Sequence, residues 1–139
     1  MNNELYEKGL KVRREVLGAE FVDKSIANAT DFNRIAQEIT TTACWGLCWG
    51  NDDLTRRERS LVNLAMISVL NRPHELSLHV KGALRNGLTE TEIRGALTHV
   101  AIYGGIPAGM DSFRIASQAN KEFRDEQAER LSERLDDAK

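Results

Sequence analysis

The chain has 139 residues, enough for one domain whose core needs no disulfide framework or structural metal. Its 19 basic and 21 acidic residues are spread along the chain and give a net charge of −2, so no cationic surface favours a nucleic acid partner. No segment approaches the roughly 18 apolar residues of a membrane span, and the charged N-terminal region contains no secretory apolar core. We therefore expect a soluble, cytoplasmic protein.

Two amphipathic helices are expected in the first third of the chain. Apolar residues at helical spacing predict the first over about residues 3–17, and Gly18 suits the left-handed conformation that ends a helix. Thr30 or Asp31 is expected to cap the second, which runs through an aromatic segment and ends at Gly50.

Two central helices follow. Thr55 and Glu58 have the spacing of a capping box, which starts a helix whose body at 61–70 is apolar nearly all round. That pattern is typical of a helix buried at the centre of a domain. Pro73 suits the first turn of the next helix, which is expected to end at Gly87.

The last third of the chain is also helical in pattern. Thr89 and Glu92 form a second capping box, and the helix that they start is expected to stop at Gly104. Pro107 can start a final helix, which leads into a charged tail at 124–139 that is expected to be solvated, frayed or packed on another subunit. Since no segment shows β-hairpin patterning, residues 1–139 are predicted to form a single all-α domain, a bundle of about six helices.

The segment from Arg72 to His79 is the first candidate for chemistry. Glu75 and His79 are four residues apart on a helix, so the carboxylate can orient and charge the imidazole. Arg72 lies at the entry of the same helix and can hold an anionic group of a ligand. The alternative is an ordinary surface Glu–His pair, which the spacing alone does not exclude.

Other histidines and tyrosines add weaker candidates. His74 and His79 are five helical positions apart and point in different directions, and no HExxH or Cys/His pattern is present, so no metal is expected. His99 and Tyr103 are four apart, and their polar tips can face one cavity. The alternative for His99 is a hydrogen-bonded core residue.

Two tryptophans and two cysteines share one predicted helix. Trp45 and Trp49 lie on one helical face and can wall a pocket or pack in the core or at a subunit interface. Cys44 and Cys48 form a CxxxC near a helix C-terminus, where the helix dipole disfavours a thiolate. We interpret these cysteines as small apolar residues, and a redox pair is the alternative.

Motifs that carry a family resemblance are spread over nearly all of residues 4–123. They are the segments 5–14 and 28–32, Trp45-Gly46 with Trp49, Arg59-Ser60-Leu61, the segment 71–76 with His79, and the run 99–107. Together they resemble the carboxymuconolactone decarboxylase family, and within it the γ-carboxymuconolactone decarboxylases, in the alkylhydroperoxidase-like (AhpD-like) superfamily.

The resemblance implies an all-helical fold and a ring-like homo-oligomer of six subunits. It also implies cofactor-independent decarboxylation of 4-carboxymuconolactone to 3-oxoadipate enol lactone and CO₂ in the breakdown of protocatechuate. A reaction of this kind requires a stabilised oxyanion and one proton. The expected catalytic residues are His79, Glu75 and His99, and the expected substrate-binding residues are Arg72, Trp45, Trp49 and Tyr103.

In the related peroxidases the active element is a CxxC motif followed by a histidine. Placing that histidine on His79 puts Arg72 and Glu75 where the two cysteines would be, which implies proton transfer instead of redox chemistry at this element. Three alternatives stay open: a lyase acting on another lactone or β-keto acid, a thiol-dependent alkylhydroperoxidase-like reductase using Cys44 and Cys48, and a non-enzymatic assembly protein.

Overall fold

The computed structural model describes residues 3–139, and the regular structure in this range is entirely helical. Its elements are the α-helices α1 (Asn3–Leu17), α2 (Ala19–Ala27), α3 (Arg34–Ile39), α4 (Arg56–Val69), α5 (Pro73–Arg85), α6 (Glu90–His99) and α7 (Ile106–Asp137), and the π-helices η1 (Thr40–Cys48) and η2 (Val100–Gly104). The all-helical prediction is confirmed, with seven α-helices in this range where about six were expected.

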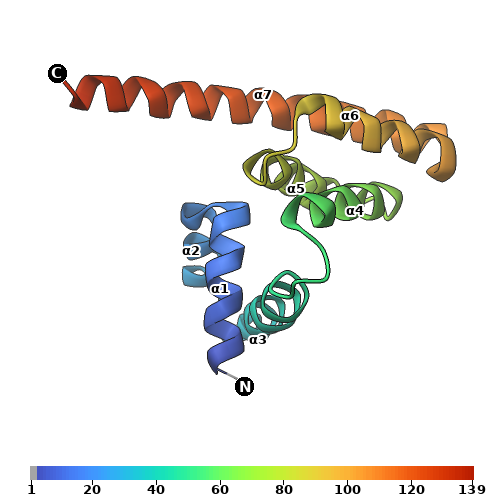
Figure 1. Ribbon diagram of the computed structural model, residues 1–139. Helices are drawn as coiled ribbons and strands as arrows, with labels where there is room; N and C mark the ends of the chain where they lie inside the picture. Colours follow the sequence, from blue (N-terminus) through green and yellow to red (C-terminus); the bar gives the residue numbers. More distant parts are fainter. Residues whose placement is uncertain (1–2) are drawn as a thin grey trace.

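The helices form two lobes, each with its own apolar core. Figure 1 shows α1, α2 and α3 in a lower lobe and α4 to α7 in an upper one, with α7 running along the top and ending beyond the other helices. The lower core includes Val16 and Val22, and the upper core includes Leu64 and Leu97. Leu78 of α5 packs against the lower core, so α5 belongs to both lobes and holds them together.

Several helix boundaries lie where the sequence predicts them. The Thr55 hydroxyl accepts from the Glu58 amide at 3.2 Å, and the Glu58 carboxylate accepts from the Thr55 amide at 3.2 Å. Thr89 and Glu92 repeat this reciprocal pair at 3.1 and 3.2 Å. Gly18 has a φ of 93°, a left-handed conformation that suits glycine. Both capping boxes are confirmed.

The second predicted helix begins later than expected. α3 starts at Arg34 behind Asn33, and neither Thr30 nor Asp31 caps it. The reason is that the Asn33 side-chain oxygen accepts from the Thr30 amide at 2.7 Å and holds a turn ahead of the helix. The sequence analysis also missed α2, which follows α1 after the single residue Gly18.

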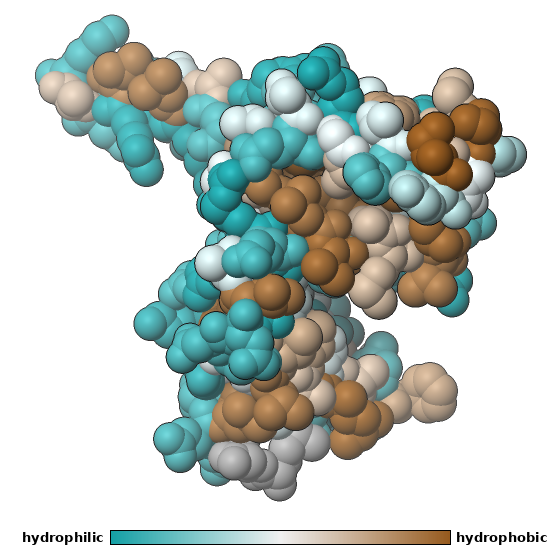
Figure 2. Space-filling view, turned by 45° about the vertical axis from the view of Figure 1, so that its right-hand side comes forward, coloured by the Kyte–Doolittle hydropathy of each residue, from teal (hydrophilic) through white to brown (hydrophobic). Residues whose placement is uncertain are grey.

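The description of α4 as a helix buried all round is wrong. Leu64 is fully buried, but Val62, Met66, Val69 and Leu70 are each about half exposed. The helix packs on α5 and α6 along one face only, which leaves the apolar side chains of its other face uncovered in the single chain. Figure 2 shows apolar residues at the surface of both lobes, above and below an indentation between the lobes.

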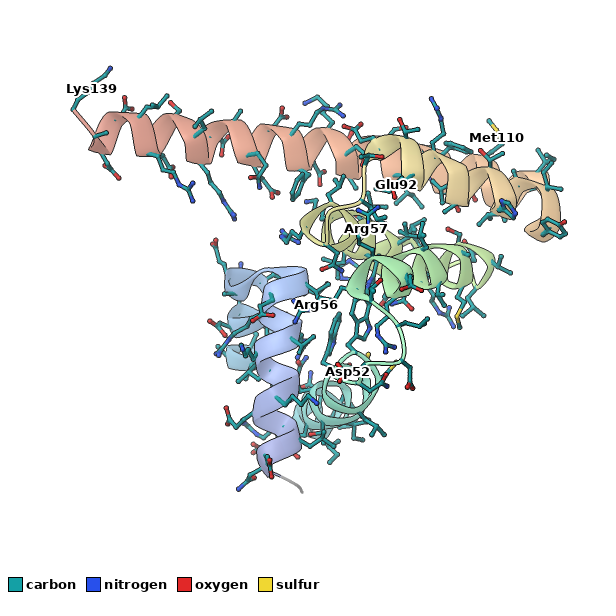
Figure 3. All side chains as sticks on the ribbon, viewed as in Figure 1. Asp52, Arg56, Arg57, Glu92, Met110 and Lys139 are labelled. Carbon is teal, nitrogen blue, oxygen red and sulfur yellow. The ribbon has the colours of Figure 1, made fainter. Side chains whose placement is uncertain are left out.

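The charged C-terminal stretch is helical, since α7 continues to Asp137. Its last turns are exposed, in agreement with the expected solvation of 124–139. Ion pairs join α4 to its neighbours. Arg56 lies 2.6 Å from Glu15 of α1, and Arg57 pairs with Glu92 of α6. Figure 3 labels Arg57 and Glu92 of the second pair. Among residues 3–139, none of the helices has the length and apolar character that crossing a membrane requires.

Candidate active site

Two indole rings and an imidazole ring meet where the lobes join. Trp45 and Trp49 lie one turn apart on η1, with ring centroids 4.9 Å apart, and their side chains are only 3% and 5% exposed. His79 of α5 stacks on both, at 6.0 Å and 3° from Trp45 and at 6.1 Å and 28° from Trp49. The sequence-predicted residues Trp45, Trp49 and His79 therefore form one cluster, although they come from different lobes.

A close backbone approach fixes η1, and with it the tryptophans. A Cβ added to Gly9 of α1 would lie 1.9 Å from the carbonyl oxygen of Thr41, and one added to Gly46 would lie 2.5 Å from that of Leu5. Only glycine allows this contact between α1 and η1. The widened π-helical winding, with the Trp49 amide donating to the Cys44 carbonyl at 2.9 Å, sets where the indoles point.

The tryptophans keep His79 neutral. Loss of solvent around the ring lowers the pKa of His79 to about 4, and the charge of Glu75 raises that pKa by less than burial lowers it. The expectation that Glu75 would charge the imidazole is therefore wrong at neutral pH. The physical reason is that Glu75 is exposed to water, which screens its charge, whereas two indoles cover the ring.

One nitrogen of His79 has no partner. Nδ1 is buried and makes no hydrogen bond with any residue in 3–139. A buried polar atom without a partner is costly, and such atoms are often found where a ligand or water completes the site. Nδ1 of His79 therefore keeps an unused hydrogen-bonding capacity inside the cluster.

Arg72 and Glu75 precede His79 at the start of α5. Glu75 and His79 are four residues apart on one face of the helix, and Arg72 flanks its first turn; these three residues are called the α5 stripe. Arg72 is the N-terminal flanking residue of α5 and is exposed, and no ion pair of its guanidinium occurs within the described residues. A cation at a helix N-terminus adds to a local potential that favours anions.

His99 and Tyr103 form a separate pair. Their rings stack at 5.6 Å and 16°, with His99 at the end of α6 and Tyr103 near the end of η2, and both side chains are exposed. The stacking brings the two rings together, and the prediction that their polar tips face one cavity stays a prediction. Among residues 3–139 neither ring stacks on the Trp45–Trp49–His79 cluster, so the single chain does not bring His99 to His79.

The cysteines lie on η1 beside the tryptophans, and both are free thiols. Partial burial and the neighbouring Cys48 raise the pKa of Cys44, while the more distant charge of Arg13 lowers it by less. A raised thiol pKa is the opposite of what a reactive cysteine needs. This environment does not favour the thiol-dependent alternative.

Arg59 is a buried cation that the sequence analysis named only as part of a motif. It lies in the first turns of α4, is 8% exposed, and donates from Nη2 to the carbonyl and side-chain oxygens of Asn51 at 3.1 and 2.5 Å. Its Nη1 lies 3.8 Å from Cys48 Sγ. The signal in the sequence was an arginine on the buried face of a helix that starts with a capping box.

The largest groove on the surface lies away from this cluster. It runs between α2, α5 and α7 and contains Lys81, which pairs with Glu122 at 2.8 Å and Glu126 at 3.2 Å. None of the predicted site residues lines it. Within 3–139 there is also no group of three or more His, Cys, Asp or Glu side chains arranged to hold a metal ion.

Comparison with known proteins assigns this arrangement to a family. The model of the carboxymuconolactone decarboxylase family matches residues 36–118, which include η1, α4, α5 and α6. The chain belongs to this family. The resemblance seen in the sequence is thereby confirmed, and the family match includes both tryptophans, Arg59, the stripe on α5, and the His99–Tyr103 pair.

Two relatives are decarboxylases. The nitrosuccinic acid decarboxylase of Metarhizium robertsii is 40% identical over 118 residues, which cover 85% of this chain and 82% of that protein. The 4-carboxymuconolactone decarboxylase of Acinetobacter baylyi is 37% identical over 124 residues, 88% of this chain and 92% of that protein. The chain is accordingly a decarboxylase of the carboxymuconolactone decarboxylase family.

Proposed function

We propose that the protein decarboxylates 4-carboxymuconolactone to 3-oxoadipate enol lactone and CO₂, without an added cofactor. The observation that carries the proposal is the uncharged His79, which stacks on two indoles and keeps an unpaired ring nitrogen. Identity of 37% to a 4-carboxymuconolactone decarboxylase supports this substrate.

The reaction needs a place for an electron pair. In 4-carboxymuconolactone the departing carboxylate and a carboxymethyl arm share one ring carbon. When the bond to the carboxylate breaks, CO₂ leaves and its electron pair spreads through the ring alkene to the lactone carbonyl oxygen. Uptake of one proton at the α-carbon then gives the enol lactone, so each CO₂ released consumes one proton.

His79 suits the stabilisation of that oxyanion. A neutral imidazole donates one N–H, and a donor in a site shielded from water stabilises developing negative charge more than it would in bulk water. The approach of a dianionic substrate also favours the protonated imidazole, so His79 can pass a proton onward as charge develops. Glu75 adds to the same tendency, because its charge raises the pKa of His79.

The remaining residues bind and orient the substrate. Trp45 and Trp49 supply an apolar wall that disfavours the charge of the departing carboxylate, and loss of CO₂ removes that charge. Arg72, at the exposed end of the α5 stripe, attracts the dianion and holds a carboxylate. His99 and Tyr103 reach such a substrate only from another part of the assembly, and His99 is then the second proton donor.

Nitrosuccinic acid is a second candidate substrate, favoured by the 40% identity to a nitrosuccinic acid decarboxylase. Its chemistry is parallel, since the nitro group accepts the electron pair that CO₂ leaves behind, and protonation of the resulting nitronate at carbon completes the reaction. Both compounds carry a second carboxylate on a CH₂ arm of the carbon that loses CO₂.

A hexameric ring is also proposed. α4, η2 and the start of α7 expose large apolar side chains on the single chain, namely Val62, Met66, Val69, Leu70, Ile102, Tyr103, Ile106 and Met110. Neighbouring subunits that cover this surface would bury area that monomeric proteins rarely expose.

The test is release of CO₂ from 4-carboxymuconolactone and from nitrosuccinate. We expect turnover of at least one of them and a fall in kcat of at least about a hundredfold in His79→Ala, the scale for losing a proton donor. His74→Ala, a change of an exposed histidine on the same helix, is the control. CO₂ release from nitrosuccinate alone would refute 4-carboxymuconolactone as the substrate, and absence of release from both compounds would refute both candidates. Unchanged turnover in His79→Ala would refute the role of His79.

A further inference from the structure

Arg59 is a buried cation without an anion. Its side chain is 8% exposed, no carboxylate within residues 3–139 lies in ion-pair range of it, and Nε is buried without a hydrogen-bond partner. The adjacent carboxylate, Glu58, is exposed and engaged in the capping box with Thr55. A buried charge that lacks a counter-charge is expensive, and a bound anion relieves that cost.

The guanidinium reaches the end of the helix that carries the two tryptophans. Arg59 extends from α4 of the upper lobe to the end of η1 in the lower lobe, where Nη1 lies 3.8 Å from the sulfur of Cys48. The next residue is Trp49, whose ring stacks on His79. A thiol is a weak hydrogen-bond partner, so a carboxylate readily replaces it at Nη1.

Asn51 fixes the direction of the guanidinium. Both of its oxygens accept from Nη2, while its own side-chain amide donates to the Leu47 carbonyl at 3.0 Å. Because Asn51 engages Nη2, Nη1, whose hydrogen-bond contact among the described residues is the weak one to Cys48, is the donor left for a ligand. The opposite edge, at Nε, has no solvent access.

We propose that Arg59 binds the carboxylate that the substrate keeps, which is the carboxylate of the CH₂ arm. This inference rests on the proposed function, because both candidate substrates carry that arm on the reacting carbon. The departing carboxylate is a poor partner for Arg59, since a cation held against it stabilises the ground state and slows the loss of CO₂. Arg59 is thus a residue that selects dianions with a carboxymethyl arm, in addition to the exposed Arg72.

The test uses an inert ligand and the two tryptophans of the chain, which both lie in the cluster. The ligand is the saturated lactone dicarboxylate in which the ring alkene of 4-carboxymuconolactone is reduced, so that the electron pair has no path to the carbonyl. Its affinity, and that of its methyl ester at the carboxymethyl arm, are measured by the change in tryptophan fluorescence. We expect the wild type to bind the dicarboxylate at least about tenfold more tightly than the ester.

Arg59→Gln should remove this preference for the dicarboxylate, and Arg59→Lys should retain part of it. Arg57→Gln removes another arginine of α4, one that pairs with Glu92 of α6, and is the control: it should keep the preference even if thermal stability falls. An unchanged preference in Arg59→Gln, an equal loss in Arg57→Gln, or no binding of the dicarboxylate to the wild type would overturn the proposal. If Arg59→Gln does not fold, Arg59→Lys decides. The proposal is overturned if this variant prefers the dicarboxylate as strongly as the wild type does and its KM for the decarboxylated substrate is unchanged.

Failure of the proposed function gives a different result. Without CO₂ release from either candidate substrate, the decarboxylation proposal falls, whereas the preference for the dicarboxylate is still measured on the inert ligand. Conversely, if the wild type releases CO₂ and Arg59→Gln has the same KM for that substrate, only the proposed role of Arg59 is removed.

Discussion

Replacing His79 by phenylalanine separates the titration of the ring from its packing. Phenylalanine keeps a flat ring against Trp45 and Trp49 but cannot take up a proton. The folded chain holds the pKa of His79 at about 4, because burial disfavours the imidazolium, whereas the unfolded chain takes up the proton below about pH 6.5. The stability that the buried, neutral His79 ring contributes is therefore present above pH 6.5 and is lost as the pH falls towards 4.

The difference between the folded and unfolded pKa of His79 corresponds to roughly 3 kcal/mol of unfolding free energy across the whole titration. About 2 kcal/mol of this is lost between pH 7 and pH 4.5. Urea unfolding followed by circular dichroism at these two pH values should show the wild type losing about 2 kcal/mol more than His79→Phe. His74→Gln, an exposed change on the same helix, should behave like the wild type.

The opposite sign would refute the reasoning. If Glu75 controlled the ring, the folded pKa would lie above the unfolded one, and the wild type would gain stability relative to His79→Phe as the pH falls. Equal pH dependence in the wild type and His79→Phe would show that the indoles do not desolvate the ring.

Three further predictions concern the packing, the thiols and the assembly. Gly9→Ala should lower the free energy of unfolding by about 3 kcal/mol or more, because the new Cβ meets the Thr41 carbonyl. Gly95→Ala, on α6, has open space around its Cβ and should raise the free energy of unfolding by roughly 0.5–1 kcal/mol. Thermal or urea unfolding measures both changes. The double change of Cys44 and Cys48 to serine should leave CO₂ release within about twofold of the wild type, and loss of activity would point to thiol chemistry. Met66→Glu should shift the mass measured by light scattering towards the monomer, and an unchanged mass would place the subunit contacts elsewhere.

The sequence predicts those helix ends that local chemistry decides. The capping boxes at Thr55 and Thr89 and the left-handed Gly18 depend on residues within one turn, so pattern reading places them correctly. The start of α3 was misplaced because Thr30 and Asp31 both fit the pattern of a cap, whereas the Asn33 side chain holds a turn there and the helix begins only at Arg34.

The candidate site was predicted in its residue types but not in its electrostatics. Helical spacing pairs Glu75 with His79 and Trp45 with Trp49, since partners within a helix are local. The stacking of His79 on both indoles joins α5 to η1, and no local rule gives that contact or the lowered pKa that follows from it. Arg59 escaped notice for the same reason, because its burial depends on packing between lobes.

An uncharged histidine and a buried arginine suit different ends of one dianion. A site that neutralised both carboxylates equally would bind substrate and transition state alike and gain little rate. In the proposed arrangement, Arg59 holds the carboxylate that stays and the indoles lie against the one that leaves, so charge is stabilised only where it persists. His79, neutral until the substrate arrives, then meets charge that develops on the electron-accepting group. A lactone carbonyl and a nitro group both accept that charge on oxygen, so one arrangement of donors can serve either substrate, and the choice between them falls to the shape of the space beside the tryptophans.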